Sequence, residues 1–539
     1  MFTMNWPCRV VVIGMSVVLL LLRRSPERSL AIIGLAGGLY MAFLAAYRLY
    51  LYPQFLTPFR SLSTPVGRHW LWGNYLDRNE NPIVYLRREA VLFYKEDIVR
   101  VYGPLNIEVL FAMSPRAIRD LLCRRSKDFV KPRVAEKIFS TVGARGLVAS
   151  NGNKHRLHRQ QISAAYTPCN VREQCPIIVE QALRMAESMD AENKEQGRVY
   201  LWDILNRAGL AIVCKTQLDT HFDPIRHETT VKKVLERFLF GISLGTCVKA
   251  LMCCALPESI QTIVQPQVPG LADLKCFVRR IITEEKKQTQ TRRRMSGKRA
   301  TLLSCLLEGD IFGDGERVQQ SVDFLLAGSA TVTFTMQWAL FVLSRDPDLQ
   351  GKVRNEVRQC LPSPTTTRLD EWSHIFLKRL DDGLPSLQAF CNEVFRCYPA
   401  ISLTGREACC DTTLAGVYVP KGTLVLLSPP VANQNPEWWG PDAAEFNPAR
   451  WLNGDGSFNS SAGGNQIHNR YTFLTFGQGP RSCIGQELGR LEVNIMVAIM
   501  LGKFEMQLAD EQKEPVVMGI LSPIPRDDVV VHLRELHGW

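Results

Sequence analysis

The chain has 539 residues, 46% hydrophobic and 22% charged, so it can bury a large core as one large domain or as several smaller ones. Its formal net charge of +11 suits an anionic membrane surface or an acidic protein partner. The charge does not indicate a nucleic-acid-binding protein, because the sequence lacks the interleaved aromatic and basic residues of a nucleic-acid-binding groove. The 16 cysteines include no repeated C-x-x-C spacing, which favours reduced cytosolic thiols over a metal cluster.

Two apolar segments open the chain. Residues 10–22 are largely apolar, charged residues interrupt, and residues 30–47 are again apolar. The second segment is long enough to span a bilayer, whereas the first is marginal. A cleaved signal peptide is the alternative, which we disfavour because a longer apolar segment follows at once. We expect residues 1–50 to form an N-terminal membrane anchor with one or two apolar segments; arginines on both flanks of the second leave its orientation open.

A proline-containing segment follows the apolar residues. Pro53, Pro58 and Pro65 recur in it, and proline lacks the N–H that a helix interior needs. We expect residues 51–60 to be a linker that joins neither neighbouring helix. Residues 61–539 are then expected to form the folded domain.

Local patterns predict the first elements of that domain. Two β-rich runs are joined at Tyr102-Gly103-Pro104, and Ser114 is a predicted N-cap with Pro115 at the first helical position. Helical patterns dominate the middle of the chain. We expect the charged run at residues 284–300 to be a solvated loop.

The stretch FGQGPRSCIGQELGR, residues 476–490, surrounds a single cysteine with four glycines. Glycines permit tight turns and the close approach of a flat ligand, and the apolar spacing that follows predicts a helix beginning near Cys483. Unpaired N–H groups and the helix dipole stabilise a thiolate there. An anionic sulfur beside Arg481 suits an axial haem ligand, with the arginine available to a propionate. For an isolated cysteine, a buried structural role would be the preferred interpretation.

The spacing within this stretch strengthens the haem interpretation. Phe476, Gly479, Arg481, Cys483 and Gly485 form F-x-x-G-x-R-x-C-x-G, which resembles the haem-binding loop of the cytochrome P-450 superfamily. The resemblance implies that Cys483 ligates the iron of haem b and donates electron density that favours O–O cleavage. It also implies that Phe476 and Arg481 contact the cofactor.

Two further segments resemble the family in the expected order. The segment CNEVFRCYP provides Glu393 and Arg396, three residues apart on one helical face, and EFNPARW provides Arg450. The resemblance implies a buried structural network around the haem loop. An ordinary exposed pair of helical side chains is the alternative.

Three more basic residues match the family less closely. In GNKHRLHRQQISAAY, His155 and Arg159 stand where the family has an aromatic donor and an arginine four residues later, and the histidine replaces the commoner tryptophan. In GREACCDTTLAGVYVPKG, Arg406 resembles the strand arginine of the family, and a hairpin is expected at Pro420-Lys421-Gly422. The resemblance implies that the three basic side chains donate to haem propionates.

The long segment SVDFLLAGSATVTFTMQWALFVL is apolar enough to pass as a transmembrane span. Its small residues favour a different interpretation, because they leave room for a ligand against the backbone. In the family, the corresponding helix crosses the haem and carries A-G-x-(acid)-T. Residues 327–331 read A-G-S-A-T, with Ala330 in place of the acid. The resemblance implies that Thr331 holds water and oxygen in the proton-delivery path.

The resemblance covers roughly residues 61–539. It implies a mainly α fold with a smaller β-rich part, the cytochrome P-450 fold, as a single large haem-thiolate catalytic domain behind an N-terminal membrane anchor. It also implies a monooxygenase, and the two N-terminal apolar runs resemble those of fungal secondary-metabolism members. An apolar lining expected from Phe324, Leu325 and Leu326, together with the anchor, favours a lipophilic substrate such as a terpenoid, polyketide or fatty acyl chain. The expected location is the endoplasmic reticulum membrane, with the catalytic domain facing the cytosol.

Electron supply separates this function from its alternatives. The sequence has no evident dinucleotide or flavin fingerprint, so we expect electrons from an NADPH-dependent flavoprotein reductase. One alternative is a haem-thiolate isomerase or dehydratase that acts without a reductase. The other is a non-catalytic membrane haem-binding protein.

Overall fold

The fold is described from a computed structural model of the protein. The described residues are 26–67, 69, 73–74, 89–141, 145–220, 270–292, 300–459, 470–512, 515, 517–518, 524–525 and 528–539. The chain divides into two compact units. The first unit comprises Met1–Leu76 and Arg100–Val109, and the second comprises Asp77–Val99 and Leu110–Trp539. The predicted apolar segment at residues 10–22 lies outside the described residues.

The first unit contains two consecutive helical segments. Helix α2 (Pro26–Ala46) leads directly into the π-helix η1 (Tyr47–Leu56), which contains Pro53. Pro53 has no N–H to donate, and the carbonyl of Leu49, four residues earlier, accepts a hydrogen bond from Asn106 Nδ2 at 2.8 Å. The wider π-helical turn and this outside donor accommodate the proline inside a helix. The prediction that the proline-containing linker joins neither neighbouring helix is therefore wrong for its first part.

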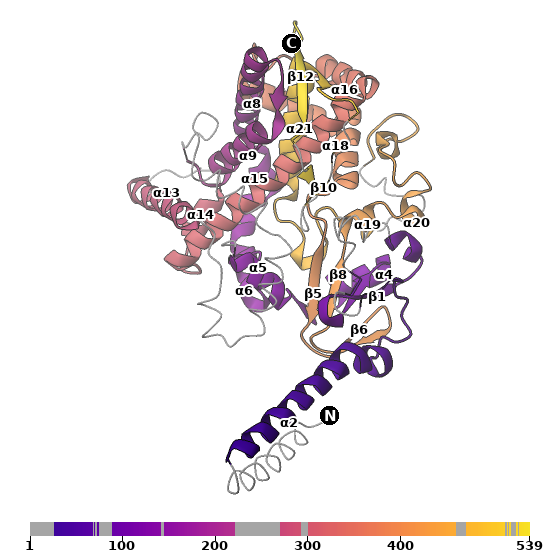
Figure 1. The fold of residues 1–539 in the computed structure, drawn as a ribbon. Helices are drawn as coiled ribbons and strands as arrows, with labels where there is room; N and C mark the ends of the chain where they lie inside the picture. Colours follow the sequence, from indigo (N-terminus) through magenta and orange to yellow (C-terminus); the bar gives the residue numbers. More distant parts are fainter. Residues whose placement is uncertain are drawn as a thin grey trace. The chain divides into compact units, whose positions relative to one another are not determined.

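The second unit is mainly helical and is organised around helix α15 (Asp314–Arg345), which runs through its middle (Figure 1). Helices α9 (Leu201–Gln217) and α21 (Gln486–Lys503) pack on it. Glycine permits the close approach of α9 and α15, since a Cβ on Gly209 would lie 2.9 Å from the Ser329 carbonyl oxygen.

The remaining helical elements lie before, between and after these three. They are η2 (Val91–Phe93), η3 (Pro104–Asn106), α4 (Pro115–Arg119), η4 (Asp120–Arg124), α5 (Arg133–Thr141), α6 (Gly152–Ile162), η5 (Ser163–Tyr166), α7 (Pro168–Arg172), α8 (Cys175–Gln196), α13 (Leu271–Arg292), α14 (Leu302–Leu307), α16 (Pro347–Cys360), α17 (Leu369–Asp382), α18 (Pro385–Cys397), α19 (Pro429–Asn433), α20 (Pro436–Trp439), η6 (Pro448–Trp451) and η7 (Gly479–Arg481).

Among the residues that the structure describes, α15 is the one helix with the length and hydropathy of a membrane span. Of its most apolar window, 83% is buried inside the protein. This burial confirms the prediction that the segment is a core helix. Its side chains join those of α8, α9 and α21 in a continuous apolar core, which includes the fully buried Met336, Ile495 and Phe504.

The strands form smaller sheets. They are β1 (Ile98–Tyr102), β2 (Glu108–Ala112), β3 (Phe129–Val130), β4 (Val199–Tyr200), β5 (Thr404–Ala408), β6 (Thr412–Leu414), β7 (Val417–Val419), β8 (Leu424–Leu427), β9 (Phe504–Leu508), β10 (Val517–Met518), β11 (Ile524–Pro525) and β12 (Val530–Glu535). The sheet orders are β1-β2-β8-β5-β3, β4-β12-β9, β6-β7 and β10-β11. In the largest sheet, β5 and β8 pair antiparallel with Arg406 opposite Val425. The predicted mainly α fold with a smaller β-rich part is confirmed.

Two local predictions agree with the structure. Strands β1 and β2 match the two β-rich runs, and Ser114 caps α4 by accepting a hydrogen bond from the Ala117 N–H at 3.2 Å. One prediction is wrong in part, because α13 continues to Arg292 through the first half of the charged run that we expected to be a loop. The residues from 293 to 299 lie outside the described part of the chain.

The hairpin in this region lies at a different turn from the predicted one. Strands β7 and β8 belong to different sheets, so Pro420-Lys421-Gly422 connects two sheets and closes no hairpin. The hairpin joins β6 to β7 through Ala415 and Gly416, whose φ angles are 47° and 90°. A two-residue hairpin loop favours positive φ at both positions, which explains why it forms here.

Candidate active site

A cavity of about 440 Å³ lies within the second unit. Its wall combines residues of α5, α6 and α15, the start of β5, and the Cys483 loop, which we define as residues 476–485. All seven predicted site residues line this cavity: His155, Arg159, Thr331, Arg406, Phe476, Arg481 and Cys483. They come from four separate regions of the chain.

Glycines determine the path of the Cys483 loop. Gly477 and Gly479 have φ angles of 65° and 73°, a conformation that favours glycine. A Cβ on Gly479 would also lie 2.2 Å from the carbonyl oxygen of Leu122, so no side chain fits at that position. The Cys483 N–H donates to the Phe476 carbonyl at 2.7 Å and closes the loop.

The Cys483 side chain is exposed toward the cavity and lies just before α21. Burial within the protein raises the pKa of its thiol, whereas a hydrogen bond from the Gly485 backbone N–H and the charge of Arg159 oppose that rise. The Gly485 N–H thus acts on the thiol pKa in the direction expected of a helix terminus, although desolvation is the larger effect. A metal cation bound to the sulfur would supply the missing stabilisation of the thiolate.

Phe476, the first residue of the loop, contacts a second aromatic ring and a guanidinium group. Its ring packs edge-on against Phe395 at a centroid distance of 5.2 Å. The guanidinium of Arg490 lies 4.9 Å from the centre of the Phe476 ring. These contacts fix a flat apolar side chain in the cavity wall.

Four basic side chains gather in one part of the cavity wall. Burial, and then repulsion from neighbouring cations, lowers the pKa of Lys131 to about 7 and of Arg406 and Arg481 to about 10. The same causes lower the pKa of His155 to about 4, so its imidazole is neutral at pH 7 and donates through one N–H. Among the described residues that line the cavity, Asp323 is the one acid.

This cluster fits a dianionic ligand. Buried cations that depress one another's pKa values lack compensating negative charge, which two carboxylates such as haem propionates would provide. Sequence reasoning missed Lys131, which follows β3 and carries no recognisable pattern; only its place in the cavity wall reveals it.

Arg159 contacts the Cys483 loop directly. Its Nη1 donates to the carbonyl of Ser482 at 2.8 Å. Arg481 is itself a residue of the loop, and its Nη1 donates to the Ser150 carbonyl at 2.6 Å and its Nη2 to Asn151 Oδ1 at 2.9 Å. The two arginines therefore support the loop in addition to lining the cavity.

Helix α15 presents small residues and hydroxyl groups to the same cavity. Thr331 Oγ1 donates to the Ala327 carbonyl at 2.9 Å, and Thr335 Oγ1 donates to the Thr331 carbonyl at 2.9 Å. Ala330 lines the cavity, whereas Ser329 is fully buried and donates to the Leu325 carbonyl. Thr331 thus places a cavity hydroxyl next in sequence to the position where the family has an acid.

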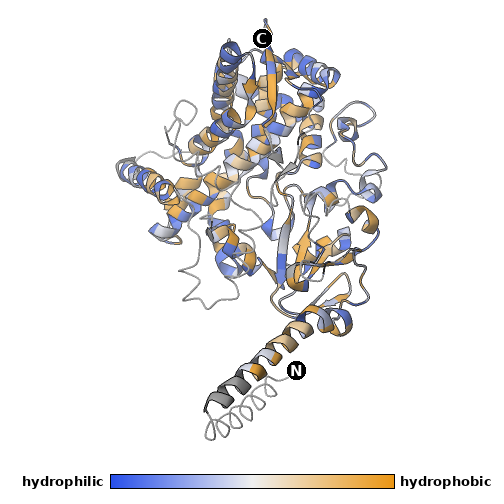
Figure 2. Cartoon of the chain, in the orientation of Figure 1, coloured by the Kyte–Doolittle hydropathy of each residue, from blue (hydrophilic) through white to orange (hydrophobic). Residues whose placement is uncertain are grey.

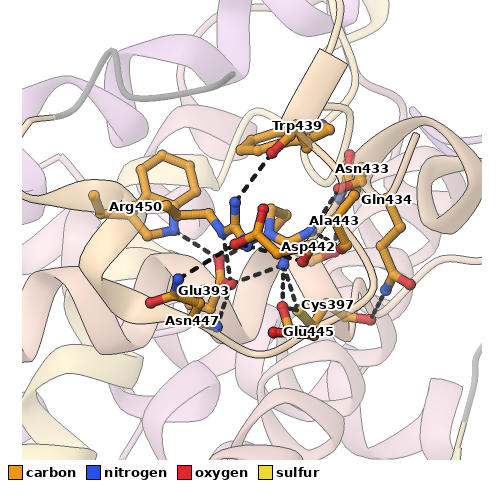
Figure 3. Close-up of polar contacts among 12 residues, drawn as sticks. Glu393, Cys397, Asn433, Gln434, Trp439, Asp442, Ala443, Glu445, Asn447 and Arg450 are labelled. Carbon is orange, nitrogen blue, oxygen red and sulfur yellow. Dashed lines mark hydrogen bonds and ion pairs between the residues drawn. The ribbon is translucent and has the colours of Figure 1, made fainter. Parts of the chain in front are cut away.

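The predicted network of Glu393, Arg396 and Arg450 is present in the structure (Figure 3). Glu393 Oε1 accepts hydrogen bonds from Arg396 Nη2 at 2.7 Å and Arg450 Nε at 2.9 Å. The Asn447 N–H also donates to Oε1 at 2.8 Å, and Oε2 accepts from Arg396 Nε at 2.7 Å and Trp451 Nε1 at 2.9 Å. Glu393 and Arg396 are both fully buried, so the alternative of an exposed helical pair is excluded.

The network extends toward the Cys483 loop through Asn433. Arg396 Nη1 donates to the Asn433 carbonyl at 2.9 Å. The Asn433 side chain accepts from the Leu474 N–H at 2.8 Å and donates to Thr475 Oγ1 at 2.8 Å. These contacts fix the backbone immediately before the loop.

Comparisons with known proteins agree with this arrangement. The family model described as Cytochrome P450 matches residues 64–531. The chain is 30% identical to Cytochrome P450 monooxygenase FSL4 of Gibberella zeae, with 96% of this chain and 95% of that protein covered. It is 29% identical to Cytochrome P450 monooxygenase sphH of Aspergillus fumigatus over 92% and 91% of the two chains. The chain therefore belongs to the cytochrome P450 family and is a monooxygenase of that type.

Proposed function

We propose that this chain is a membrane-attached haem-thiolate monooxygenase that inserts one oxygen atom from O₂ into a lipophilic substrate. The observation that carries the proposal is a cavity lined by a cysteine, a cluster of buried cations and a helix of small residues. Cys483 is the proposed iron ligand of haem b, and Phe476 is proposed to pack on the cofactor. Lys131, His155, Arg406 and Arg481 supply donors suited to the propionates.

When bound, the haem iron supplies the chemistry of oxygen activation. The protein contributes the thiolate, the shape of the cavity and the route of the protons. Thr331 has a hydroxyl that can exchange its bond to the Ala327 carbonyl for a bond to water in the cavity. Ala330 has no group that carries a proton, so the proposed route uses Thr331, water or a hydroxyl of the substrate.

Electrons are proposed to come from NADPH through a flavoprotein reductase. The formal charge of +11 supports an acidic protein partner. Large apolar side chains on α2 support membrane attachment, and the described part of that helix is coloured mostly as hydrophobic in Figure 2. Leu35, Leu39, Met41 and Phe43 are each more than half exposed. We propose residues 1–50 as the anchor and residues 61–539 as the catalytic domain, at the endoplasmic reticulum membrane on its cytosolic side.

The cavity wall supports a lipophilic substrate. Phe139, Leu147, Phe324, Leu326 and Phe334 contribute to it, and apolar side chains bind hydrocarbon surfaces by removing them from water. The relatives named above come from fungi. We infer a role in the biosynthesis of a secondary metabolite such as a terpenoid or polyketide.

The carbon monoxide difference spectrum of the reduced protein tests the cysteine assignment. We expect the red-shifted band of a thiolate-ligated haem in the wild type and its loss in Cys483→Ser. Cys409→Ser is the matched control, because Cys409 is exposed outside the cavity lining. A thiolate band that persists in Cys483→Ser would refute the assignment.

Ala330 favours one second candidate, a haem-thiolate isomerase or dehydratase that needs no reductase. Turnover assays with and without NADPH and reductase distinguish the two functions. Product that requires NADPH, reductase and O₂ together supports the monooxygenase, whereas product from a peroxide substrate without NADPH supports the isomerase.

A further inference from the structure

The loop of residues 145–151 forms part of the cavity wall. Leu147 and Val148 line the cavity between α5 and α6 in the sequence. The loop makes a turn in which the N–H groups of Ala149 and Ser150 both donate to the Gly146 carbonyl, at 3.2 and 3.0 Å. The position of this turn therefore decides how far the two apolar side chains reach into the cavity.

Two acceptors on α15 hold the start of this loop. Asp323 accepts from the Arg145 N–H at 3.1 Å through Oδ1 and from the Gly146 N–H at 2.7 Å through Oδ2. Gln320 Oε1 accepts from the Leu147 N–H at 2.9 Å. Three consecutive backbone N–H groups are thus bound by two side chains that are 2% and 1% exposed.

Neighbouring side chains fix the orientation of both acceptors. Gln319 Nε2 donates to Asp323 Oδ1 at 3.0 Å, and Gln320 Nε2 lies 2.9 Å from His158 Nδ1 on α6. The Leu147 N–H can only donate, so it fixes the Gln320 oxygen toward the loop and leaves the amide nitrogen facing His158. Neither acceptor can therefore rotate away from the loop without losing a second hydrogen bond.

The other end of the loop is held by the Cys483 loop. Arg481 donates to the Ser150 carbonyl and to Asn151 Oδ1. Residues 145–151 are consequently tied to α15 at one end and to the proposed haem ligand loop at the other. The apolar residues Leu147 and Val148 lie between the two attachments.

We propose that Asp323 and Gln320 are positioning residues that set the cavity wall at Leu147 and Val148 and thereby determine which substrates fit. The inference rests on the proposed function, because it assigns a specificity role at the same cavity. Asp323 lines the cavity, but both of its carboxylate oxygens are bound to the loop backbone. The effect of both side chains is exerted through the loop backbone.

Gly146 provides independent support for a tight attachment. A Cβ at this position would lie 2.6 Å from Gln320 Oε1 and 2.7 Å from Asp323 Oδ2. Gly146→Ala would therefore push the loop away from both acceptors while leaving the two side chains unchanged. Gly146→Ala thus disturbs the contact between the loop and Asp323 by a change in the loop, whereas Asp323→Asn disturbs it by a change on α15.

The carboxyl group of Asp323 suits the attachment, because both of its oxygens accept from the loop. Burial raises the pKa of its carboxyl to about 7, and the backbone donors of the loop oppose that rise. The charge of Lys275 on α13 interacts favourably with the Asp323 carboxylate. In Asp323→Asn, an NH₂ group replaces one acceptor oxygen. Its N–H groups then face the N–H donors of the loop, so one of the two hydrogen bonds is lost.

The experiment compares haem-loaded wild type, Asp323→Asn, Gly146→Ala and the double variant. Asp381→Asn and Gly351→Ala are matched controls, because Asp381 is an exposed residue of α17 and a Cβ on Gly351 meets open space. Hydrogen exchange measured by mass spectrometry reports protection of the 145–151 backbone. Absorbance titrations with imidazole and with 4-phenylimidazole report ligand binding, since only the larger probe extends toward the cavity wall.

We expect faster exchange of the loop in both single variants, and a change on the order of tenfold in the affinity ratio of 4-phenylimidazole to imidazole. Imidazole affinity should stay at the wild-type value. The double variant should resemble either single variant, because both substitutions break one contact.

Unchanged exchange in Asp323→Asn would show that the loop is held by other contacts and would overturn the inference. Faster exchange with an unchanged affinity ratio would also overturn it, because the loop would then play no part in selecting ligands. A wild type that gives no absorbance change with imidazole would instead refute the proposed haem function.

Discussion

Removing the carboxylate of Glu393 should destabilise the haem-loaded protein before it affects the chemistry. This carboxylate accepts five hydrogen bonds, two of them from Arg396, and is fully buried. Deleting one partner of a buried ion pair typically costs about 3–5 kcal/mol, because the remaining charge stays desolvated. That is a large share of the ~5–15 kcal/mol by which a protein is usually stable.

The magnitude for Glu393→Ala should lie at the upper end of that range. Two guanidinium groups, Arg396 and Arg450, lose their shared counterion, although Arg396 keeps its bonds to the carbonyls of Asn433, Ala443 and Glu445. Glu393→Gln keeps one acceptor oxygen and should cost less. The damage should reach the Cys483 loop through the Asn433 contacts, so haem loading should fall together with stability.

Urea unfolding, followed by tryptophan fluorescence and by haem absorbance, measures both effects. Asp381→Ala is the matched control, because its partner Arg172 and Asp381 itself are each more than half exposed. An exposed pair of this kind contributes only about 0–1 kcal/mol. A Glu393→Ala variant with full haem loading, control-like stability and selectively slow turnover would refute the structural role.

Three further predictions concern single positions. Thr331→Ala should lower the product formed per NADPH consumed by on the order of tenfold while haem binding is retained, and unchanged coupling would exclude a role for this hydroxyl in proton delivery. Gly479→Ala should sharply reduce the yield of haem-loaded protein, since its Cβ would meet the Leu122 carbonyl oxygen at 2.2 Å and its φ is 73°; normal loading would contradict the strain argument. Burial raises the pKa of Glu492 to about 8, so the stability contributed by its protonated form should be lost as pH rises from about 5 to about 8. The free energy of unfolding, measured with urea at both pH values, should fall less with rising pH in Glu492→Gln than in the wild type. An equal fall in both proteins would refute the assignment of this pH dependence to Glu492.

Several features of this protein could be predicted from residues that are close together in the sequence. The spacing around Cys483 predicted a glycine-rich loop before a helix, because turn conformation and helix periodicity depend on neighbouring residues. The pairing of Glu393 with Arg396 followed in the same way, since residues three apart share a helical face. The core position of α15 followed from its small residues together with the family resemblance.

Tertiary structure decided the features that depend on burial and on distant segments. The pKa of the Cys483 thiol is raised because desolvation outweighs the local helix terminus. Lys131 joins the basic cluster because β3 ends at the cavity, and Asp323 contacts Gly146 across 177 positions of sequence. No local pattern contains these contacts, because the packing of α15 against separate segments brings the groups together and removes water from them.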